Sequence, residues 1–316
     1  NEPDLYARRV VQMGAKMQVE RIHKIVIAGS GVMGGSIALL FAQHGYEVTV
    51  YDISEKGLEQ CKRRLREENK TGVIAFTREK GCFEQADFVI EAIVENLEIK
   101  HAFWREISAM VPGQAILTTN TSGLSITQIA KAVISPERFC GMHWLNPPHI
   151  CPLIEVIKGE KTDAETANLV SQTGIRVGRV PVTLEKEVPG FLINRFQFAI
   201  LREAMSLVES GVAGKEDIDR VFKYGLGLRY ACLGPFEIAD LGGLDTFYRI
   251  ASYLFKDLSD AKQVPPMLSE LAENGDYGVK TGKGFYEYSD DRAQRVIEKR
   301  DKDFRKVADC LYDHLI

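Results

Sequence analysis

Residues 29–34 read Gly-Ser-Gly-Val-Met-Gly and stand between two segments of different character. The run before them, KIVIA at residues 24–28, is short, apolar and β-branched, which predicts a buried strand. The run after them, SIALLFAQHG, ends at Gly45 and has the apolar spacing of a helix. Glycines between such segments predict a strand, a tight turn and a helix, which is how a βαβ unit begins.

The glycines of this turn indicate a dinucleotide site. Gly29 permits the tight turn, Gly31 lets a pyrophosphate approach the backbone, and Gly34 allows close packing of the helix. The helix begins with Val32 and Met33 in this loop, and its N-terminus supplies amide donors and the positive end of a dipole.

Asp52 ends the next predicted strand, EVTVYD at residues 47–52. A carboxylate there bridges the adenosine ribose hydroxyls and repels a 2′-phosphate, so the sequence favours NAD over NADP. Two alternatives remain at this point. Asp52 also suits the cap of the following helix, and flavin proteins use the same glycine pattern, although no second mononucleotide signature is found.

Short apolar strands alternate with helical stretches through the first half of the chain. Beyond the two strands above, they are predicted at 88–93, 115–120, 138–144, 154–159 and 180–184. This alternation predicts an α/β fold with a Rossmann-like, doubly wound parallel sheet. After Glu187 the β character stops, and residues 191–209 and the remainder, including a charged last stretch, predict an all-helical C-terminal domain.

A length of 316 residues suits two domains. We place a dinucleotide-binding domain at 21–187 and a helical substrate and dimerisation domain at 188–316, with the boundary near Val188-Pro189-Gly190. Residues 1–20 are polar and lack the pattern of a signal peptide, and we interpret them as an arm or a remnant of cloning.

Composition narrows the classes of function. With 45% hydrophobic and 27% charged residues and a net charge of −4, the chain has the profile of a globular protein without the basic stripe that nucleic acid requires. No apolar run is long enough for a membrane span. The six cysteines are scattered without a C-x-x-C pair, so we expect neither a disulfide framework nor a metal site. Reduced thiols of this kind predict a cytoplasmic protein.

A candidate reacting site lies in GMHWLNPPHICPLIE, where His143 ends one predicted strand and Glu155 begins the next. A dehydrogenase needs a base of near-neutral pKa to accept the hydroxyl proton, and histidine suits this task. A carboxylate behind it fixes the tautomer and stabilises the imidazolium by roughly 4 kcal/mol at about 4 Å. Spacing alone does not bring the two together, and His143 also fits a structural histidine.

The chain resembles the L-3-hydroxyacyl-CoA dehydrogenase family from residue 22 to residue 288. Eight blocks match in order: GSGVMGGSIA, EAIVENLEIK, NTSGLSI, GMHWLNPP, IEVIKGEKT, VPGFLINR, LGPFEIADLGGLD and KTGKGFYEY. The resemblance implies a Rossmann-like domain, a helical domain that forms a homodimer interface, and NAD as cofactor.

The resemblance also implies residue roles. His143 and Glu155 take the positions of the catalytic dyad. Ser122 would hydrogen-bond the substrate oxygen and Asn194 would orient the substrate or the histidine, although Asn120 and Ser125 flank Ser122, and Asn194 also fits a helix N-terminal residue. The residues that match the nicotinamide half of the cofactor site are Glu95, Lys100 and Asn146.

Three features distinguish the chain from the acyl-CoA enzymes. The stretch between Asp52 and Phe88 holds roughly one helix, where those enzymes carry a helix-turn-helix that contacts CoA. The chain continues past KTGKGFYEY, as in L-gulonate 3-dehydrogenase (lambda-crystallin) and a pyridine-carboxylate dehydrogenase. Arg229 lies in a stretch similar to the gulonate-type enzymes and suits a free carboxylate or an ion pair. His149 fits either the cleft or a loop.

These observations predict an NAD-dependent dehydrogenase that interconverts a 3-hydroxy and a 3-keto group, as in 3-hydroxybutyryl-CoA. The first alternative is a dehydrogenase of a small free hydroxy acid of the gulonate, carnitine or pyridine-carboxylate kind. A remote alternative is an NAD-binding structural protein without turnover. The expected partners are a small-molecule substrate and a second copy of the chain, with neither nucleic acid nor membrane.

Overall fold

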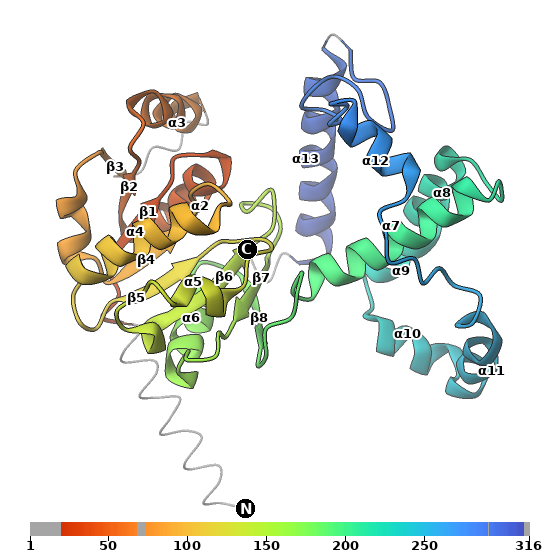
Figure 1. The fold of residues 1–316 in the computed structure, drawn as a ribbon, viewed down its shortest axis with the longest axis horizontal. Coiled ribbons are helices and arrows are strands. Elements are labelled where there is room, and N and C mark those ends of the chain that lie inside the picture. The colour runs from red at the N-terminus through yellow and green to blue at the C-terminus, as the bar shows by residue number, and fades with distance from the viewer. Residues whose placement is uncertain (1–19, 68–73, 290, 313–316) are drawn as a thin grey trace, which may run out of the picture. The chain divides into compact units, whose positions relative to one another are not determined.

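The computed structural model describes residues 20–67, 74–289 and 291–312 (Figure 1). The chain divides into two compact units, and the boundary between them in the sequence falls between Leu192 and Ile193. Apart from Glu20, the arm predicted at residues 1–20 lies outside the described residues.

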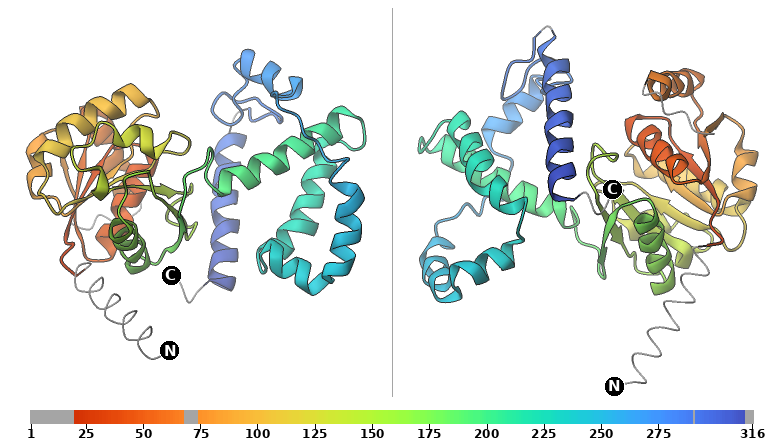
Figure 2. Two further views of the ribbon diagram at one scale, coloured as in Figure 1. Left: turned by 60° about the horizontal axis from the view of Figure 1, so that its bottom comes forward. Right: turned by 180° about the vertical axis from the view of Figure 1, so that it is seen from behind.

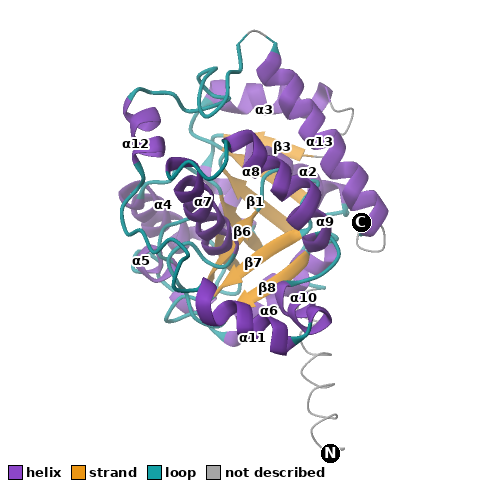
Figure 3. Ribbon diagram, turned by 90° about the vertical axis from the view of Figure 1, so that its right-hand side faces the viewer, coloured by secondary structure: helices purple, strands orange, loops and turns teal. Residues whose placement is uncertain are grey.

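The described part of the first unit forms one eight-stranded sheet, whose strands lie between helices in Figure 3. Its spatial order is β3 (Ile74–Thr77), β2 (Glu47–Tyr51), β1 (Lys24–Ala28), β4 (Phe88–Glu91), β5 (Ile116–Thr119), β6 (Phe139–Trp144), β7 (Leu153–Ile157) and β8 (Val180–Leu184). Strand order reverses between β1 and β4, and ligands of such sheets bind beyond the carboxyl ends of the strands at this point.

Both faces of the sheet are covered, because its strands are apolar on both sides. Ile25 and Ile27 of β1 belong to one core cluster, whereas Val26 and Ala28 belong to the other. Residues of α2 and α6 join the first cluster, and residues of α4 and α5 join the second. The bounds of these helices and of α3, which packs on α2, are α2 (Val32–Gln43), α3 (Glu55–Glu67), α4 (Leu97–Met110), α5 (Ile126–Ala130) and α6 (Ala164–Arg176).

Local side chains fix where the helices beside the site begin. The Asn96 side chain accepts a hydrogen bond from the Ile99 amide at 3.1 Å and starts α4. The Ser125 hydroxyl accepts one from the Gln128 amide at 3.1 Å and starts α5. Such caps satisfy amides that the first turn of a helix leaves without a partner.

The described part of the second unit is helical and is drawn in green to blue in Figure 2. Among its described residues, Met205 and Ala308 are the buried apolar side chains. No helix among the described residues has the length and apolar character needed to cross a membrane. The helices are α7 (Ile193–Glu209), α8 (Lys215–Val221), α9 (Gly227–Tyr230), α10 (Pro235–Gly242), α11 (Leu244–Leu254), α12 (Pro266–Glu273) and α13 (Arg292–Leu311).

The predicted fold class is confirmed, and the structure adds two features that the sequence did not predict. Strand β3 extends the sheet at its edge, where only four residues pair with β2. The pair β6–β7 is antiparallel within the sheet that was predicted to be parallel. The physical reason is the connection at residues 145–152, because a parallel crossover needs about a dozen residues or more.

Candidate active site and cofactor site

The glycine loop after β1 has the geometry of a turn that receives a ligand. Gly29 has a φ of +111°, which favours glycine. A Cβ on Gly34 would lie 1.9 Å from the Gly29 carbonyl oxygen, so only glycine lets α2 pack this closely. A Cβ on Gly31 would meet nothing within 4 Å, and the loop is therefore open on that side.

A cavity of about 650 Å³ lies against this loop. Its walls come from the glycine loop, the end of β2, α3, the segment after β4 and α4. The open side of Gly31, the cavity and the N-terminus of α2 together suit the adenosine and pyrophosphate of a dinucleotide. The residues present therefore fit NAD.

Asp52 lines the cavity and also holds the glycine loop. Its Oδ2 accepts hydrogen bonds from the Ser30 amide at 2.8 Å and the Ser30 hydroxyl at 2.6 Å, and its Oδ1 accepts one from the Ser54 amide at 2.9 Å. From α3, the Arg64 guanidinium donates to the Ser30 carbonyl at 2.8 Å and lines the same cavity. Asp52 thus orders the loop in addition to lining the cavity.

The predicted dyad is formed across the antiparallel strands. His143 of β6 and Glu155 of β7 are cross-strand neighbours, and His143 Nδ1 lies 2.8 Å from Glu155 Oε2. Both side chains are buried, with 5% and 1% of their surface exposed. An ionised carboxylate only accepts hydrogen bonds, so the network assigns the hydrogen to Nδ1 and leaves Nε2 with a lone pair for a proton.

Glu155 is held from its other side by the segment that leads into α7. Its Oε1 accepts a hydrogen bond from the Leu192 amide at 2.8 Å. The preceding residue, Phe191, is buried with a φ of +52°, and its ring lies 5.5 Å from the His143 ring. This φ costs a non-glycine residue about 1–3 kcal/mol, which the surrounding contacts offset. Phe191 thus packs near His143, and its neighbour Leu192 holds Glu155.

Three neighbouring polar residues in the segment after β5 have different contacts. Asn120 Oδ1 accepts a hydrogen bond from the Trp144 amide at 2.9 Å, which fixes the strand end beside His143. The Ser125 hydroxyl caps α5 and donates to Glu187 Oε1 at 2.7 Å. Ser122 is exposed in the loop between them. Asn120 and Ser125 therefore hold the end of β6 and the start of α5, and the exposed Ser122 is held through its backbone amide, which donates to Glu95 Oε1 at 3.0 Å.

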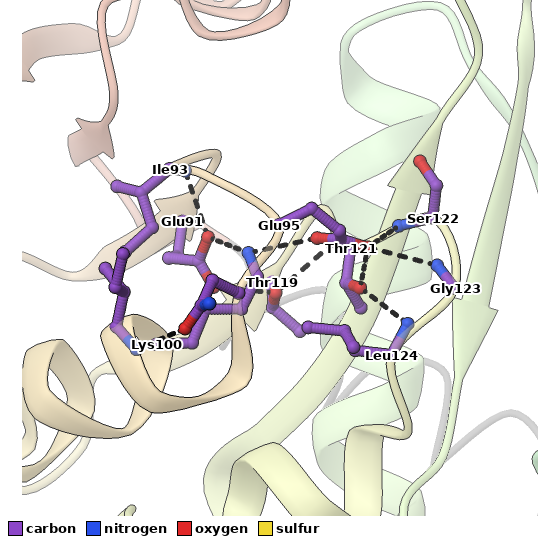
Figure 4. Close-up of polar contacts among 11 residues, drawn as sticks. Glu91, Ile93, Glu95, Lys100, Thr119, Thr121, Ser122, Gly123 and Leu124 are labelled. Atoms are coloured by element: carbon purple, nitrogen blue, oxygen red, sulfur yellow. Dashed lines mark hydrogen bonds and ion pairs between the residues drawn. The ribbon is translucent and has the colours of Figure 1, made fainter. Parts of the chain in front are cut away.

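Glu95 follows β4 and Lys100 lies in the first turn of α4, and both form a network with the buried Glu91 (Figure 4). Burial opposes ionisation of Glu95, but the Thr121 hydroxyl, the Lys100 ammonium and two backbone amides hold the pKa of this carboxyl below its usual value. Removal of one partner from a buried ion pair such as Lys100–Glu91 costs about 3–5 kcal/mol.

The remaining predicted residues lie outside the cavity wall. Val32 and Met33 form the first turn of α2, and Asn146 is exposed in the connection after β6. Asn194 is the second residue of α7, and Arg229 is exposed on α9 of the second unit. His149, in the same connection as Asn146, is half-buried. Their roles stay predictions.

Sequence reasoning missed Glu91, Phe191, Leu192 and Arg64. An acid at the end of an apolar strand was a signal for Glu91, since a buried carboxylate requires a partner. A backbone amide such as that of Leu192 carries no signal in the sequence. Arg64 is one of several basic residues on α3, and only the fold distinguishes it from the others.

Family models match nearly the whole described chain. The 3-hydroxyacyl-CoA dehydrogenase NAD binding domain matches residues 24–188, and the 3-hydroxyacyl-CoA dehydrogenase C-terminal domain matches residues 190–288.

Curated relatives include two kinds of enzyme. The chain is 36% identical over 293 residues to a 5-formyl-3-hydroxy-2-methylpyridine 4-carboxylate 5-dehydrogenase of Mesorhizobium japonicum, covering 88% of this chain and 95% of that one. It is 38% identical over 281 residues to a probable 3-hydroxybutyryl-CoA dehydrogenase of Deinococcus radiodurans. This match covers 84% of this chain and 100% of that one.

Solved structures include the same two kinds. An NAD⁺-dependent dismutase, 5-formyl-3-hydroxy-2-methylpyridine 4-carboxylic acid 5-dehydrogenase, superposes with a TM-score of 0.88 at 35% identity, covering 92% of this chain and 98% of that one. The (S)-3-hydroxybutyryl-CoA dehydrogenase of Ralstonia eutropha superposes with a TM-score of 0.69 at 31% identity. The match covers 85% of this chain and 100% of that one. The chain therefore belongs to the 3-hydroxyacyl-CoA dehydrogenase family and is an NAD-dependent oxidoreductase that acts on a CH–OH group.

Proposed function

We propose that this protein oxidises the 3-hydroxyl of a short 3-hydroxyacyl-CoA, such as 3-hydroxybutyryl-CoA, to the ketone, and catalyses the reverse reduction. The observation that carries the proposal is the buried hydrogen bond of 2.8 Å between His143 Nδ1 and Glu155 Oε2. This contact leaves Nε2 of His143 as the proton acceptor. Family membership supports the substrate class.

In the oxidation, His143 Nε2 takes the hydroxyl proton, and Glu155 stabilises the resulting imidazolium. Bound NAD⁺ would accept the hydride that leaves the carbon bearing this hydroxyl. The products are one ketone, one NADH and one proton. Ser122 donates a hydrogen bond to the substrate oxygen, and in reduction protonated His143 returns the proton to it. Asn194 orients the substrate or the histidine.

We assign the cofactor contacts to two groups of residues. The glycine loop with Gly29, Gly31 and Gly34 receives the pyrophosphate, and Asp52 faces the adenosine ribose. Val32 and Met33 supply the first turn of the helix beside them. The nicotinamide half is assigned to Glu95, Lys100 and Asn146. The cavity beside Asp52 and the open side of Gly31 support the first group.

The test measures NADH consumption with acetoacetyl-CoA and with a panel of free keto acids, alongside NAD⁺ reduction with 3-hydroxybutyryl-CoA, L-gulonate and L-carnitine. Turnover with the thioester is expected, and His143→Ala is expected to abolish it while the affinity for NADH persists. Unchanged turnover of His143→Ala would refute the dyad. Bound NADH without turnover on any substrate would support a structural NAD-binding protein.

A second candidate substrate is a small free acid of the pyridine-carboxylate kind. The observation that favours it is the longer match with the pyridine-carboxylate enzyme, which covers 92% of this chain, against 85% for the hydroxybutyryl-CoA enzyme. Arg229 would then pair with the substrate carboxylate in a bidentate manner. Arg229→Gln should lower kcat/KM for a free acid and leave thioester turnover unchanged. Turnover of the thioester alone would exclude this candidate.

We infer that the protein forms a homodimer through its second unit. Large apolar side chains of this unit are exposed, and Phe236 on α10 and Tyr248 on α11 are 86% and 76% accessible. Apolar surface of this extent is typical of a protein interface. The proposed cellular location, the cytoplasm, rests on the scattered cysteines, all six of which are free thiols.

A further inference from the structure

Glu91 is a buried carboxylate that the proposed mechanism does not use. It ends β4, and its side chain is 0% exposed. Lys100, on the first turns of α4, is 1% exposed and brings its ammonium within 2.5 Å of Glu91 Oε1. Two charges are costly to remove from water, and well-packed apolar residues often serve stability as well. The pair therefore calls for a reason other than stability.

The contacts of Glu91 join the ends of two neighbouring strands. Its Oε1 also accepts a hydrogen bond from the Ile93 amide at 3.0 Å, just after β4. Its Oε2 accepts one from the Thr119 hydroxyl at 2.8 Å, at the end of β5. Thr119 in turn accepts one from the Thr121 amide at 3.3 Å. Glu91 thereby fixes both segments that lead to the candidate active site.

Lys100 carries the connection to a second carboxylate. Its ammonium lies 3.5 Å from Glu95 Oε2, so that one cation is shared by Glu91 and Glu95. Glu95 is 44% exposed, in contrast to the buried Glu91. The network therefore runs from a buried carboxylate to a partly exposed one, and Figure 4 shows the contacts that join them.

Glu95 holds the loop that carries Ser122. Its Oε1 accepts three hydrogen bonds, from the Thr121 hydroxyl at 2.5 Å, the Ser122 amide at 3.0 Å and the Gly123 amide at 3.2 Å. The Thr121 hydroxyl also accepts one from the Leu124 amide at 3.0 Å. One carboxylate oxygen thus gathers the backbone of the loop around Ser122.

We propose that Glu91 is a positioning residue for Ser122 and acts through Lys100 and Glu95. The inference rests on the proposed function, in which Ser122 donates a hydrogen bond to the substrate oxygen. Glu91 anchors the shared ammonium, the ammonium fixes the Glu95 carboxylate, and Glu95 fixes the loop. The buried charges give the loop one position, which apolar residues would not specify.

Two variants test the inference. Glu91→Gln retains the size of the side chain and leaves Lys100 in place. The double variant Glu91→Gln with Lys100→Met removes both charges, so that no buried charge is left without a partner. Lys158→Met is the control, because Lys158 pairs with Glu185 at 3.0 Å at the surface of the same unit. Each is compared with wild type by thermal unfolding, amide hydrogen exchange and steady-state kinetics.

Both variants are expected to fold and to exchange the amides of Ser122 and Gly123 at least about tenfold faster than wild type. In Glu91→Gln, which retains Lys100, turnover of acetoacetyl-CoA with NADH should fall by up to about 100-fold, in kcat more than in the KM for NADH. Lys158→Met should change neither. Exchange of the Ser122 and Gly123 amides at the wild-type rate in the double variant would overturn the inference and leave the pair a structural feature.

Amide exchange needs no substrate, so the inference and the proposed function fail separately. Suppose that the wild type does not turn over the thioester and that the variants exchange these amides faster. The proposed substrate is then refuted, and the role of Glu91 in holding the loop is retained. Unchanged exchange in the variants of an active enzyme refutes the role of Glu91 and retains the proposed function.

Discussion

His143 and Glu155 face each other across the antiparallel strands β6 and β7, with the imidazole Nδ1 2.8 Å from the carboxylate Oε2. Twelve residues of sequence separate them, and the strand pairing brings them together. Glu155 is fixed a second time by the Leu192 amide. The base of the proposed reaction is therefore oriented by the sheet and by the segment that enters the second unit's first helix.

Glu155→Gln should lower kcat by on the order of 10²–10⁴-fold, because an amide cannot stabilise the imidazolium and can hold the wrong tautomer of His143. The affinity for NADH should stay within about twofold of wild type, since Glu155 lies outside the cofactor cavity. Stopped-flow NADH binding and steady-state kinetics measure the two effects. A kcat at the wild-type level would contradict the role of the dyad.

Gly31→Ala should impair the binding of NAD, whereas Gly34→Ala should impair the stability of the fold. A Cβ on Gly31 meets nothing and its φ is −61°, so the alanine variant should fold with a free energy of unfolding equal to wild type or about 0.4–1 kcal/mol higher. Its affinity for NAD should nevertheless fall, because the methyl group occupies the open side of the loop. Gly34→Ala should lose about 1–3 kcal/mol of stability through its clash with the Gly29 carbonyl. Urea unfolding and NAD titration distinguish the two, and unimpaired NAD binding by Gly31→Ala would contradict the assignment of the loop.

Asp52→Ala should raise the KM for NAD by on the order of 10-fold and lower the preference for NAD over NADP. The loss has two sources, namely the ribose contact and the two hydrogen bonds from Ser30. Ser30→Ala is the matched control, because it removes one hydrogen bond and keeps the carboxylate. Kinetics with both cofactors measure the ratio, and an unchanged ratio in Asp52→Ala would show that ribose discrimination lies elsewhere.

Acid should weaken the fold partly through Glu95. Its folded-state pKa lies below the ordinary value, so its contribution to stability is complete above the unfolded pKa and is lost as the pH falls through the folded pKa. Glu95→Gln has no charge to lose. Between neutral pH and about pH 3, wild type should therefore lose more unfolding free energy than this variant. Urea unfolding at several pH values measures the difference, and parallel losses would refute it.

Phe236→Asp should convert the proposed dimer into a monomer, because a charge on an 86% exposed aromatic position of α10 is costly to bury against a second copy. Light scattering after size-exclusion chromatography reports the mass. Lys256→Gln, an exposed polar change after α11, should leave the mass of wild type. A wild-type monomer would refute the dimer, and a dimeric Phe236→Asp would place the interface elsewhere.

Several elements could be predicted from local sequence. The apolar strands, the glycine loop and the amphipathic helices have periodicities that short-range sterics and burial determine. Strand β3 has only four residues at the sheet edge, too few to produce a period, and it was missed. Helix α7 begins at Ile193, later than the predicted Phe191, because Phe191 adopts a positive φ that ends any local pattern.

The sequence by itself determined the βαβ beginning, the order of an α/β and a helical part, the glycine loop between β1 and α2, and the candidate pair His143 and Glu155. Only the tertiary structure decided that β6 and β7 are antiparallel, that Leu192 binds Glu155, and that Glu91, Lys100 and Glu95 share one network. The physical reason is that periodicity reports which residues are buried. The partner of a buried charge or amide is chosen by strand register and by contacts between residues far apart in the chain, which no local pattern encodes.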